Sequence, residues 1–302
     1  MDTLSHLMGL LAPACVVNLH CRFAGRWAAD HHPLPPGVVP WHVILQGDAR
    51  LQLAGKTLDV TAGDVLLLPH GSPHILQGLV DWGQVAPIVT RHNGTVGEVR
   101  ADGAGPVVEV LCGEFHFGAN NGWLFAKESE VIHLRTRDRE DCPELEILLT
   151  MLVRESLTSQ PGSATIVDNL AATFLVLLLR VLIARREPPA GLLRLMTDPR
   201  LAPAVLAVMA EPERPWTMES MAARCFLSRA TFARHFSQRY HQTPQAWLTQ
   251  LRMVLAAKLL HQQRQQTVDV IAGRCGFLSL SSFSRTFKQI YGVTPAQYRK
   301  KD

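Results

Sequence analysis

An internal repeat near the C-terminus is the feature that most constrains how this chain folds. The segment 217–225 recurs as 267–275, an offset of 50 residues. Gly276 is then inserted in the second copy, and the offset becomes 51 for the pairs Ser228 and Ser279, Phe232 and Phe283, Phe236 and Phe287, and Tyr240 and Tyr291. A repeat of this length is one supersecondary unit used twice.

Each copy predicts a helix, a tight turn and a second helix. Ser228 and Ser279 stand where an N-cap is needed, since a serine hydroxyl accepts a hydrogen bond from a free backbone N–H at the start of a helix. The aromatic residues that follow recur at positions i, i+4 and i+8, which places them on one buried face of the second helix. The repeat therefore predicts two short helical units with similar cores.

The opposite face of each second helix is polar. It carries Arg229, Thr231, Arg234 and Gln238 in the first copy, and Ser281, Ser282, Arg285 and Lys288 in the second. These side chains are hydrogen-bond donors suited to base edges and phosphates, so the pattern favours two helix-turn-helix units whose second helices read double-stranded DNA. A helical bundle with basic, solvated faces is the alternative.

The segment between the two units predicts a spacer. Thr243-Pro244 opens a helix that runs to about Gln263, with proline at its first position. Such a helix is roughly 30 Å long, close to the roughly 34 Å of one turn of B-DNA. It would place the two second helices in adjacent major-groove segments.

The charge is distributed as DNA binding requires. The 302 residues carry a net charge of +4, but residues 196–302 hold 15 Lys and Arg against 6 Asp and Glu, a net +9. The remainder holds 15 against 20, a net −5. The basic half is the repeat-bearing half, which is what binding to phosphates needs.

The C-terminal segment resembles the AraC/XylS family of transcription regulators. The residues that carry the resemblance are Ile271-Ala-Gly-Arg-Cys-Gly-Phe277, Ser282-Phe-Ser-Arg-Thr-Phe-Lys288 and Tyr291-Gly-Val-Thr-Pro-Ala-Gln-Tyr-Arg299, and the likeness covers about residues 198–302. It implies a bipartite DNA-binding domain that acts with RNA polymerase at an operator and is controlled by an N-terminal domain. A regulator of this kind is not an enzyme.

The N-terminal part predicts a β-barrel. Short alternating apolar segments and turns run from Ala14 to about Phe117. The segment 63–74, Gly-Asp-Val-Leu-Leu-Leu-Pro-His-Gly-Ser-Pro-His, resembles the second sequence motif of cupins, whereas the first cupin motif lacks its His-x-His pair and its Glu. We expect His42 to point into the barrel near His74, because it lies on the same strand face as the position of the missing Glu.

Two amphipathic helices, 143–157 and 163–186, separate the barrel from the repeat. They are a candidate dimer seam or else pack against the barrel, and both readings stay open. The predicted fold is α+β multidomain: a cupin-like sensor over 1–135 that begins with a short amphipathic helix, a helical connector over 136–195, and an all-α double helix-turn-helix domain over 196–302.

The sensor domain offers thiol chemistry. Cys21 and Cys112 lie on predicted strands that barrel closure can bring together, where an oxidant would link them, and a protonated His42 or His74 would lower the pKa of a nearby thiol. Each cysteine is otherwise a small buried hydrophobe. Several short stretches resemble the reactive-chlorine-sensing activators of this family: 1–5, Cys21, Trp41-His42, Gln46-Gly47, 63–69 and Leu111-Cys-Gly113. The resemblance implies oxidation of Cys21 and Cys112 by an oxidant such as hypochlorous acid and activation of oxidant-defence genes. Four further thiols, Cys15, Cys142, Cys225 and Cys275, stand outside this pair.

Two other signals and one other protein class remain open. His42, His74 and Cys112 make a nitrogen and sulfur set suited to zinc, and a small organic effector is a third possibility for the barrel. A metal-dependent cupin oxygenase is the different class, and the broken ligand set and the basic C-terminal half both argue against it.

The sequence also bears on location. The apolar start has no basic residues before it, and the longest near-apolar run, 170–179, is too short to span a bilayer. We expect a cytoplasmic protein without a membrane partner, in which the six cysteines are reduced at rest.

Overall fold

The chain divides into two compact units, each described by itself. The computed structural model describes residues 2–79, 87–117, 124–125, 130–136 and 143–300. The first unit, called here the β unit, comprises Pro13–Gly118 and Lys127–Val181. The second, the helical unit, comprises Met1–Ala12, Ala119–Ala126 and Leu182–Asp302. The three segments predicted from sequence, 1–135, 136–195 and 196–302, stay a prediction.

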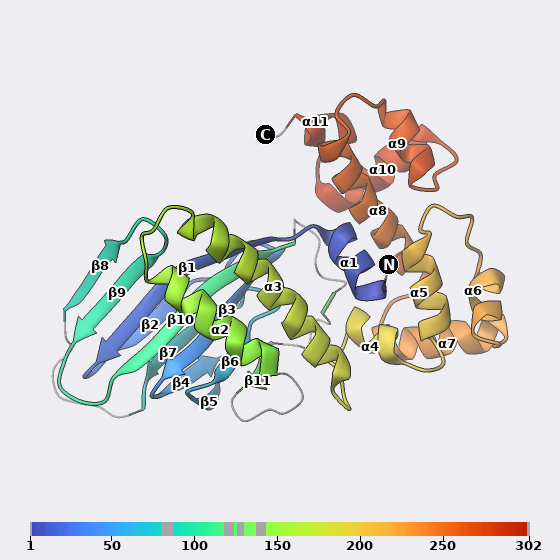
Figure 1. Ribbon diagram of the computed structural model, residues 1–302. Helices are drawn as coiled ribbons and strands as arrows, with labels where there is room; N and C mark the ends of the chain where they lie inside the picture. The colour runs from blue at the N-terminus through green and yellow to red at the C-terminus, as the bar shows by residue number, and fades with distance from the viewer. Residues whose placement is uncertain (1, 80–86, 118–123, 126–129, 137–142, 301–302) are drawn as a thin grey trace. The chain divides into compact units, whose positions relative to one another are not determined.

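The β unit contains two sheets (Figure 1). The larger has the order β11-β6-β3-β10-β1-β9-β8, from β11 (Ile132–Arg135), β6 (Asp64–Leu67), β3 (Val38–Gln46), β10 (Val108–His116), β1 (Ala14–Ala24), β9 (Gly97–Asp102) and β8 (Ile88–His92). The smaller has the order β2-β7-β4-β5, from β2 (Ala28–His31), β7 (His74–Gly78), β4 (Asp48–Leu53) and β5 (Lys56–Thr61). All pairs are antiparallel except β1 with β9.

The core of the β unit lies between the two sheets. Side chains from both sheets form one buried cluster, which includes Cys21, Ile44 and Cys112 from the larger sheet and Leu51 and Leu76 from the smaller. Burial of this kind on one face of each sheet is the main stabilising term of a two-layer β structure. The α+β class and the cupin-like arrangement are confirmed, and the described strands form two facing sheets rather than one closed barrel.

Helices α2 (Pro143–Ser156) and α3 (Ser163–Ala184) follow the sheets (Figure 1). Phe174 of α3 packs against the rings of Trp41 and Phe115 from the larger sheet, at centroid distances of 5.1 and 6.0 Å. Packing against the sheet is therefore the role that the described contacts support for α3.

One helix in the described residues has the length and composition to cross a membrane. It is α3, with 22 residues and a mean hydropathy of 2.1, longer than the predicted apolar run. Half of its most apolar 18-residue stretch is buried, and the contact of Phe174 with Trp41 of the sheet is that of a core helix.

The helical unit contains the repeat. Its helices are α1 (Thr3–Leu11), α4 (Leu192–Thr197), α5 (Ala202–Ala210), α6 (Met218–Arg224), α7 (Arg229–Tyr240), α8 (Pro244–Gln262), α9 (Val268–Arg274), α10 (Leu280–Tyr291) and α11 (Pro295–Arg299). The predicted caps are confirmed: the hydroxyl of Ser228 accepts from the backbone N–H of Thr231, and that of Ser279 from Ser282. The aromatic positions Phe232, Phe236, Phe283 and Phe287 are fully buried.

The predicted spacer helix is α8, which spans 19 residues with Thr243 as its N-cap and Pro244 in its first turn. Its length is therefore roughly 28 Å. Leu248, Leu251 and Leu260 are completely buried along it, so the spacer is anchored in the cores of the helical unit rather than exposed as a free linker.

Helix α1 belongs to the helical unit although it is the start of the chain. The side chains of Leu7, Leu10 and Leu11 are buried, and the helix packs against α5 and α8. The ammonium group of Lys258 on α8 donates a hydrogen bond to the carbonyl of Gly9 near the end of α1.

Candidate functional site

Cys21 and Cys112 lie on neighbouring strands of the larger sheet. In the β1–β10 register, Cys21 is opposite Val110 and Cys112 is opposite Leu19, so the two cysteines are diagonal neighbours. Both side chains belong to the core cluster between the sheets and are at most 8% exposed. The structure thus brings together the two thiols that the sequence singled out, and both are free thiols.

Two histidines continue from Cys112. His42 is opposite Cys112 in the β3–β10 register, and its Nδ1 lies 3.1 Å from the Cys112 Sγ. The other ring nitrogen, Nε2, lies 2.8 Å from Nε2 of His74, and Nδ1 of His74 lies 2.9 Å from the carbonyl oxygen of Ser72. The expected proximity of His42 and His74 is therefore present.

The carbonyl of Ser72 fixes the protons along this chain of hydrogen bonds. A carbonyl oxygen only accepts, so His74 donates from Nδ1 and its Nε2 is an acceptor. His42 must then donate from Nε2 and accept at Nδ1 from the Cys112 thiol. The four groups form one directional relay, Cys112 to His42 to His74 to Ser72, in which every side chain is neutral.

The electrostatics agree with a neutral relay. The pKa of Cys112 is raised well above its usual value, first by the hydrogen bond with the Cys21 thiol and then by burial. Burial lowers the pKa of His42 well below its usual value, with His31 and His74 adding to the effect, and burial lowers the pKa of His74 to about 4. The expectation that a protonated histidine lowers the thiol pKa is wrong for this state, because burial disfavours the charged form of both partners.

A third histidine, His31, was missed by sequence reasoning. It ends β2 directly opposite His74 on β7, and the two rings stack with centroids 4.3 Å apart. One ring nitrogen from each of His31, His42 and His74 lies within 4.8 Å of the others. The pairing of β2 with β7 carries no signature in the residues themselves, and the only hint was the extended Ala28-Ala-Asp-His31 segment.

The remaining described cysteines lie elsewhere. Cys15 is buried on β1, where its thiol contacts the carbonyl of Pro13 and burial raises its pKa to about 11. Cys225 and Cys275 are buried beside the two turns of the helical unit, and burial raises the pKa of both. Cys142 lies outside the described residues.

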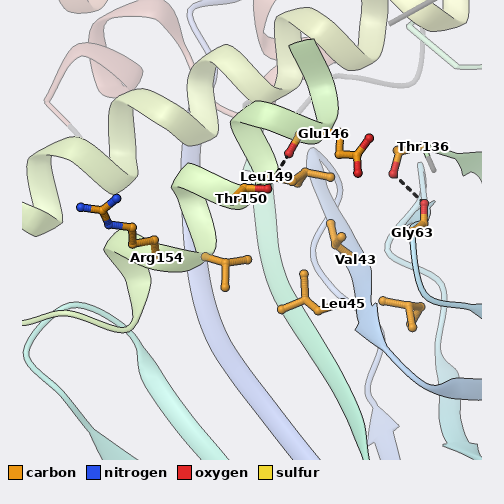
Figure 2. Close-up of a pocket in the computed structure, with 10 residues that line it drawn as sticks. Val43, Leu45, Gly63, Thr136, Glu146, Leu149, Thr150 and Arg154 are labelled. Atoms are coloured by element: carbon orange, nitrogen blue, oxygen red, sulfur yellow. Dashed lines mark hydrogen bonds between the residues drawn. The ribbon is translucent and has the colours of Figure 1, made fainter. Parts of the chain in front are cut away.

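A hollow of about 420 Å³ lies between α2 and β3, outside the space between the sheets (Figure 2). Val43, Leu45 and Leu149 form an apolar wall, and Glu146 and Arg154 of α2 place opposite charges along it. The hydroxyl of Thr136 is already committed to the carbonyl of Gly63, 2.7 Å away. The hollow is mainly apolar with a few polar groups, as small-molecule sites are.

The eight polar residues predicted to face DNA all lie on α7 and α10. On α7, Arg234 and Gln238 are exposed, Thr231 is half-buried with its hydroxyl bonded to Ser228, and Arg229 forms a 3.0 Å ion pair with Glu219. On α10, Ser281, Ser282, Arg285 and Lys288 are all exposed. Among the described residues, Arg234, Arg285 and Lys288 form no ion pair, so their charges are available to phosphates and bases.

Two apolar residues at the turns were also missed by sequence reasoning. Phe226 is 97% exposed just before the N-cap of α7, and Leu278 is fully exposed just before the N-cap of α10. The first turn of a recognition helix is the part that meets base edges, and an apolar side chain there suits the methyl group of thymine. A full exposure of this kind depends on the turn geometry, which the sequence did not specify.

Two family models match the chain. The family model described as a cupin matches residues 2–184, and the one described as a helix-turn-helix domain matches residues 221–301. A solved AraC-type DNA-binding protein from Chromobacterium violaceum is 30% identical, covers 34% of this chain and 91% of its own, and gives a TM-score of 0.32.

Full-length relatives are regulators rather than enzymes. An HTH-type transcriptional regulator of Haemophilus influenzae is 32% identical over 99% of both chains. The RCS-specific HTH-type transcriptional activator RclR of Escherichia coli is 28% identical over 100% of this chain and 98% of its own. The chain therefore belongs to the AraC family of DNA-binding transcription regulators, with a cupin domain preceding its helix-turn-helix domain.

Proposed function

We propose that this regulator is a cytoplasmic transcription activator that is switched on when an oxidant such as hypochlorous acid links Cys21 to Cys112, and that it controls genes for oxidant defence. The observation that carries the proposal is the placement of the two thiols as diagonal neighbours on β1 and β10, both within one core cluster. The printed name of the Escherichia coli relative, an RCS-specific activator, supports the choice of signal.

The redox step balances with one oxidant molecule. The two thiols lose two electrons and two protons and form one S–S bond, while hypochlorous acid takes up both electrons and one proton and leaves as chloride and water; the second proton passes to solvent. The relay gives the Cys112 proton an acceptor within reach, because Nδ1 of His42 lies 3.1 Å from the sulfur.

A disulfide across this diagonal would move the backbone. Diagonal neighbours in an antiparallel pair have Cα atoms about 7–8 Å apart, whereas a disulfide rarely bridges more than about 7 Å. The register of β1 and β10 already shifts between Val17 and Leu19, next to the position opposite Cys112. The ladder between β1 and β10 is locally interrupted at that irregularity, so β1 can move there without breaking regular pairing. We expect oxidation to shift β1 relative to β10 at this point, which brings Cys21 closer to Cys112.

The displaced strand is joined to the helical unit through the chain itself. β1 begins at Ala14, directly after α1 ends at Leu11 and two connecting residues. Within the helical unit, α1 packs on the spacer helix α8, where Lys258 holds the carbonyl of Gly9. A displacement of β1 would therefore shift α1. Because α1 packs on α8, it would also shift the helix that separates the two recognition helices.

The test measures thiols and transcription in the same samples. The reduced full-length chain and its Cys21→Ser and Cys112→Ser variants are treated with one equivalent of hypochlorite, mapped by peptide mass spectrometry, and assayed for transcription with RNA polymerase from a responsive promoter. We expect the wild type to lose two thiols as a Cys21–Cys112 linkage and to gain activity, and each variant to stay inactive.

Cys15→Ser is the matched control, because Cys15 is also buried on β1 but lies outside the pair. It should respond like the wild type. An oxidant response that persists in Cys21→Ser or Cys112→Ser would refute the disulfide, and a response lost in Cys15→Ser would show that β1 itself is being damaged.

A small organic effector is the second candidate signal, and the hollow between α2 and β3 is the observation that favours it. Its mainly apolar wall with Glu146 and Arg154 suits an apolar molecule with one polar end. Binding of such a molecule, lost on Leu149→Trp and accompanied by activation without thiol oxidation, would favour this candidate. A homodimer stays a prediction for either signal.

A further inference from the structure

Three imidazoles from three strands meet at one place in the β unit. His31 ends β2, His42 lies within β3, and His74 begins β7. The rings of His31 and His74 are stacked, and the ring of His42 stands edge-on to both at centroid distances of 4.8 and 5.0 Å. Among the described residues no carboxylate forms an ion pair with these rings, although Asp30 acts on His31 and His74 electrostatically. Three imidazoles gathered in a core are an arrangement that hydrophobic packing alone does not require.

Backbone carbonyls orient two of the three rings. Nδ1 of His31 lies 3.2 Å from the carbonyl oxygen of Ala29, and Nδ1 of His74 lies 2.9 Å from that of Ser72. Each ring donates from Nδ1, so each has an acceptor lone pair on Nε2, which in His74 accepts from Nε2 of His42 when no metal is bound. Metal-binding histidines are held in this way, with one nitrogen donating to a carbonyl while the other faces the ion.

We propose that His31, His42 and His74 bind a zinc ion through their Nε2 atoms. Zinc–nitrogen bonds of about 2.0–2.1 Å place the nitrogens of a tetrahedral site about 3.3 Å apart. The His42 and His74 nitrogens, 2.8 Å apart, need to separate by about half an ångström, and the full set, within 4.8 Å, needs to contract. Ring rotations supply both movements.

The donor set selects the kind of ion. Neutral imidazole suits zinc and the neighbouring late transition metals, whereas calcium and magnesium require oxygen donors. Burial keeps the rings neutral, because it lowers the pKa of each of the three histidines. A neutral nitrogen is the form that binds a metal.

Cys112 stands beside this site rather than in it. Its sulfur contacts Nδ1 of His42, which is on the opposite edge of the ring from the nitrogen that faces His74. One ion cannot take both Nε2 of His42 and the sulfur at these positions. When zinc takes Nε2, the remaining proton of His42 sits on Nδ1 and donates to the Cys112 sulfur, so Cys112 is an outer-shell partner.

A hollow of about 470 Å³ on the smaller sheet adjoins the site, because His74 is one of its lining residues, with Asp30 and Lys56 among the others. His31, the next residue after Asp30, is only half-buried. The carboxylate of Asp30 attracts a cation to this hollow and the ammonium of Lys56 opposes it, and we expect an ion to approach the imidazoles from this side.

The test is zinc binding to the full-length reduced chain after treatment with a chelator. Zinc is titrated in competition with a chromophoric chelator, and cobalt(II) is added separately to record its visible spectrum. We expect one equivalent of zinc and a cobalt spectrum without a thiolate charge-transfer band. His31→Gln and His74→Gln should each weaken binding by more than the roughly 10–100-fold that follows from loss of an outer-shell partner.

Two controls define the site. His20→Gln replaces a buried histidine on β1 that lies outside the cluster. Cys112→Ser replaces the outer-shell partner. Both variants should still bind one equivalent of zinc. Circular dichroism confirms that each variant is folded. The site is refuted if the wild type binds no zinc or if His31→Gln binds as tightly as the wild type. Zinc that is lost in Cys112→Ser would refute the proposed ligand set. The disulfide is tested separately by the thiol mapping, which is carried out on chelator-treated protein, where Nδ1 of His42 is free to accept from Cys112.

Discussion

Replacing Phe226 with glycine should stabilise the helical unit. Phe226 has a backbone φ of +54°, a left-handed conformation that costs an L-residue roughly 1–2 kcal/mol, and its side chain is 97% exposed, so little burial is lost. The greater freedom of glycine in the unfolded chain takes back roughly 0.5–1 kcal/mol. The net expectation is a stabilisation of about 0.5–1 kcal/mol.

The second repeat supplies the matched control. Gly276 follows Cys275 as Phe226 follows Cys225, and its φ of +77° matches the left-handed φ of Phe226. The expectation that Gly276 is the inserted residue is therefore wrong, because the extra residue of the second copy lies between Gly276 and Ser279. A Cβ added at Gly276 would lie 2.6 Å from the carbonyl oxygen of Glu213. Gly276→Ala should therefore destabilise the same unit by more than about 1 kcal/mol. One substitution introduces glycine at a left-handed backbone position and the other removes it. Their effects on the free energy of unfolding should therefore have opposite signs.

The assay is urea-dependent hydrogen exchange, because the amides of α6, α7, α9 and α10 report on the helical unit alone. The free energy of unfolding is compared for the wild type, Phe226→Gly and Gly276→Ala. A loss of stability in Phe226→Gly would mean that the exposed ring makes a native contact that outweighs the backbone strain. A neutral Gly276→Ala would refute the steric argument at this turn.

Three further outcomes are expected. Arg285→Ala should weaken specific DNA binding by roughly 1–3 kcal/mol and relax base preference, measured by fluorescence anisotropy; unchanged affinity and preference would remove it from the DNA-facing surface. Gly113→Ala should destabilise the β unit by roughly 3 kcal/mol in urea unfolding, since the new Cβ would lie 2.2 Å from both Trp41 and the Val16 carbonyl, whereas Gly273→Ala, with open space on α9, should not destabilise. In chelator-treated protein, the free energy of unfolding should fall by roughly 3 kcal/mol more in the wild type than in His74→Gln as the pH drops from about 6.5 to about 4, because the unfolded chain protonates His74 before the folded chain does; a pH dependence unchanged in His74→Gln would contradict this.

The helical unit was predictable because its information is local. The caps at Ser228 and Ser279, the aromatic spacing on α7 and α10, and the proline at the start of α8 each lie within one helical turn of the structure that they specify. Each copy also supports the interpretation of the other, since a pattern that recurs over a whole unit, at an offset of 50 and then 51 residues, is unlike a chance match.

The β unit was less predictable because its contacts depend on pairing between distant strands. Short strands between Ala14 and about Phe117 could be expected from the apolar segments and turns, but the position of His31 opposite His74 follows from the pairing of β2 with β7. The proton directions from Cys112 to Ser72 depend on that geometry as well. Period-two alternation identifies which face of a strand is buried and leaves its partner unspecified.

The docking of α1 on α5 and α8 also bears on how the protein is made. During synthesis the first helix emerges before its binding surface exists, and Gly9 and Lys258 are 249 residues apart in the chain. Contacts of such long sequence separation form late and slow folding. The DNA-binding half thus cannot complete its packing until α1, which is synthesised much earlier, returns to it. A fragment that starts at residue 196 would leave bare the surface that Leu7, Leu10 and Leu11 cover.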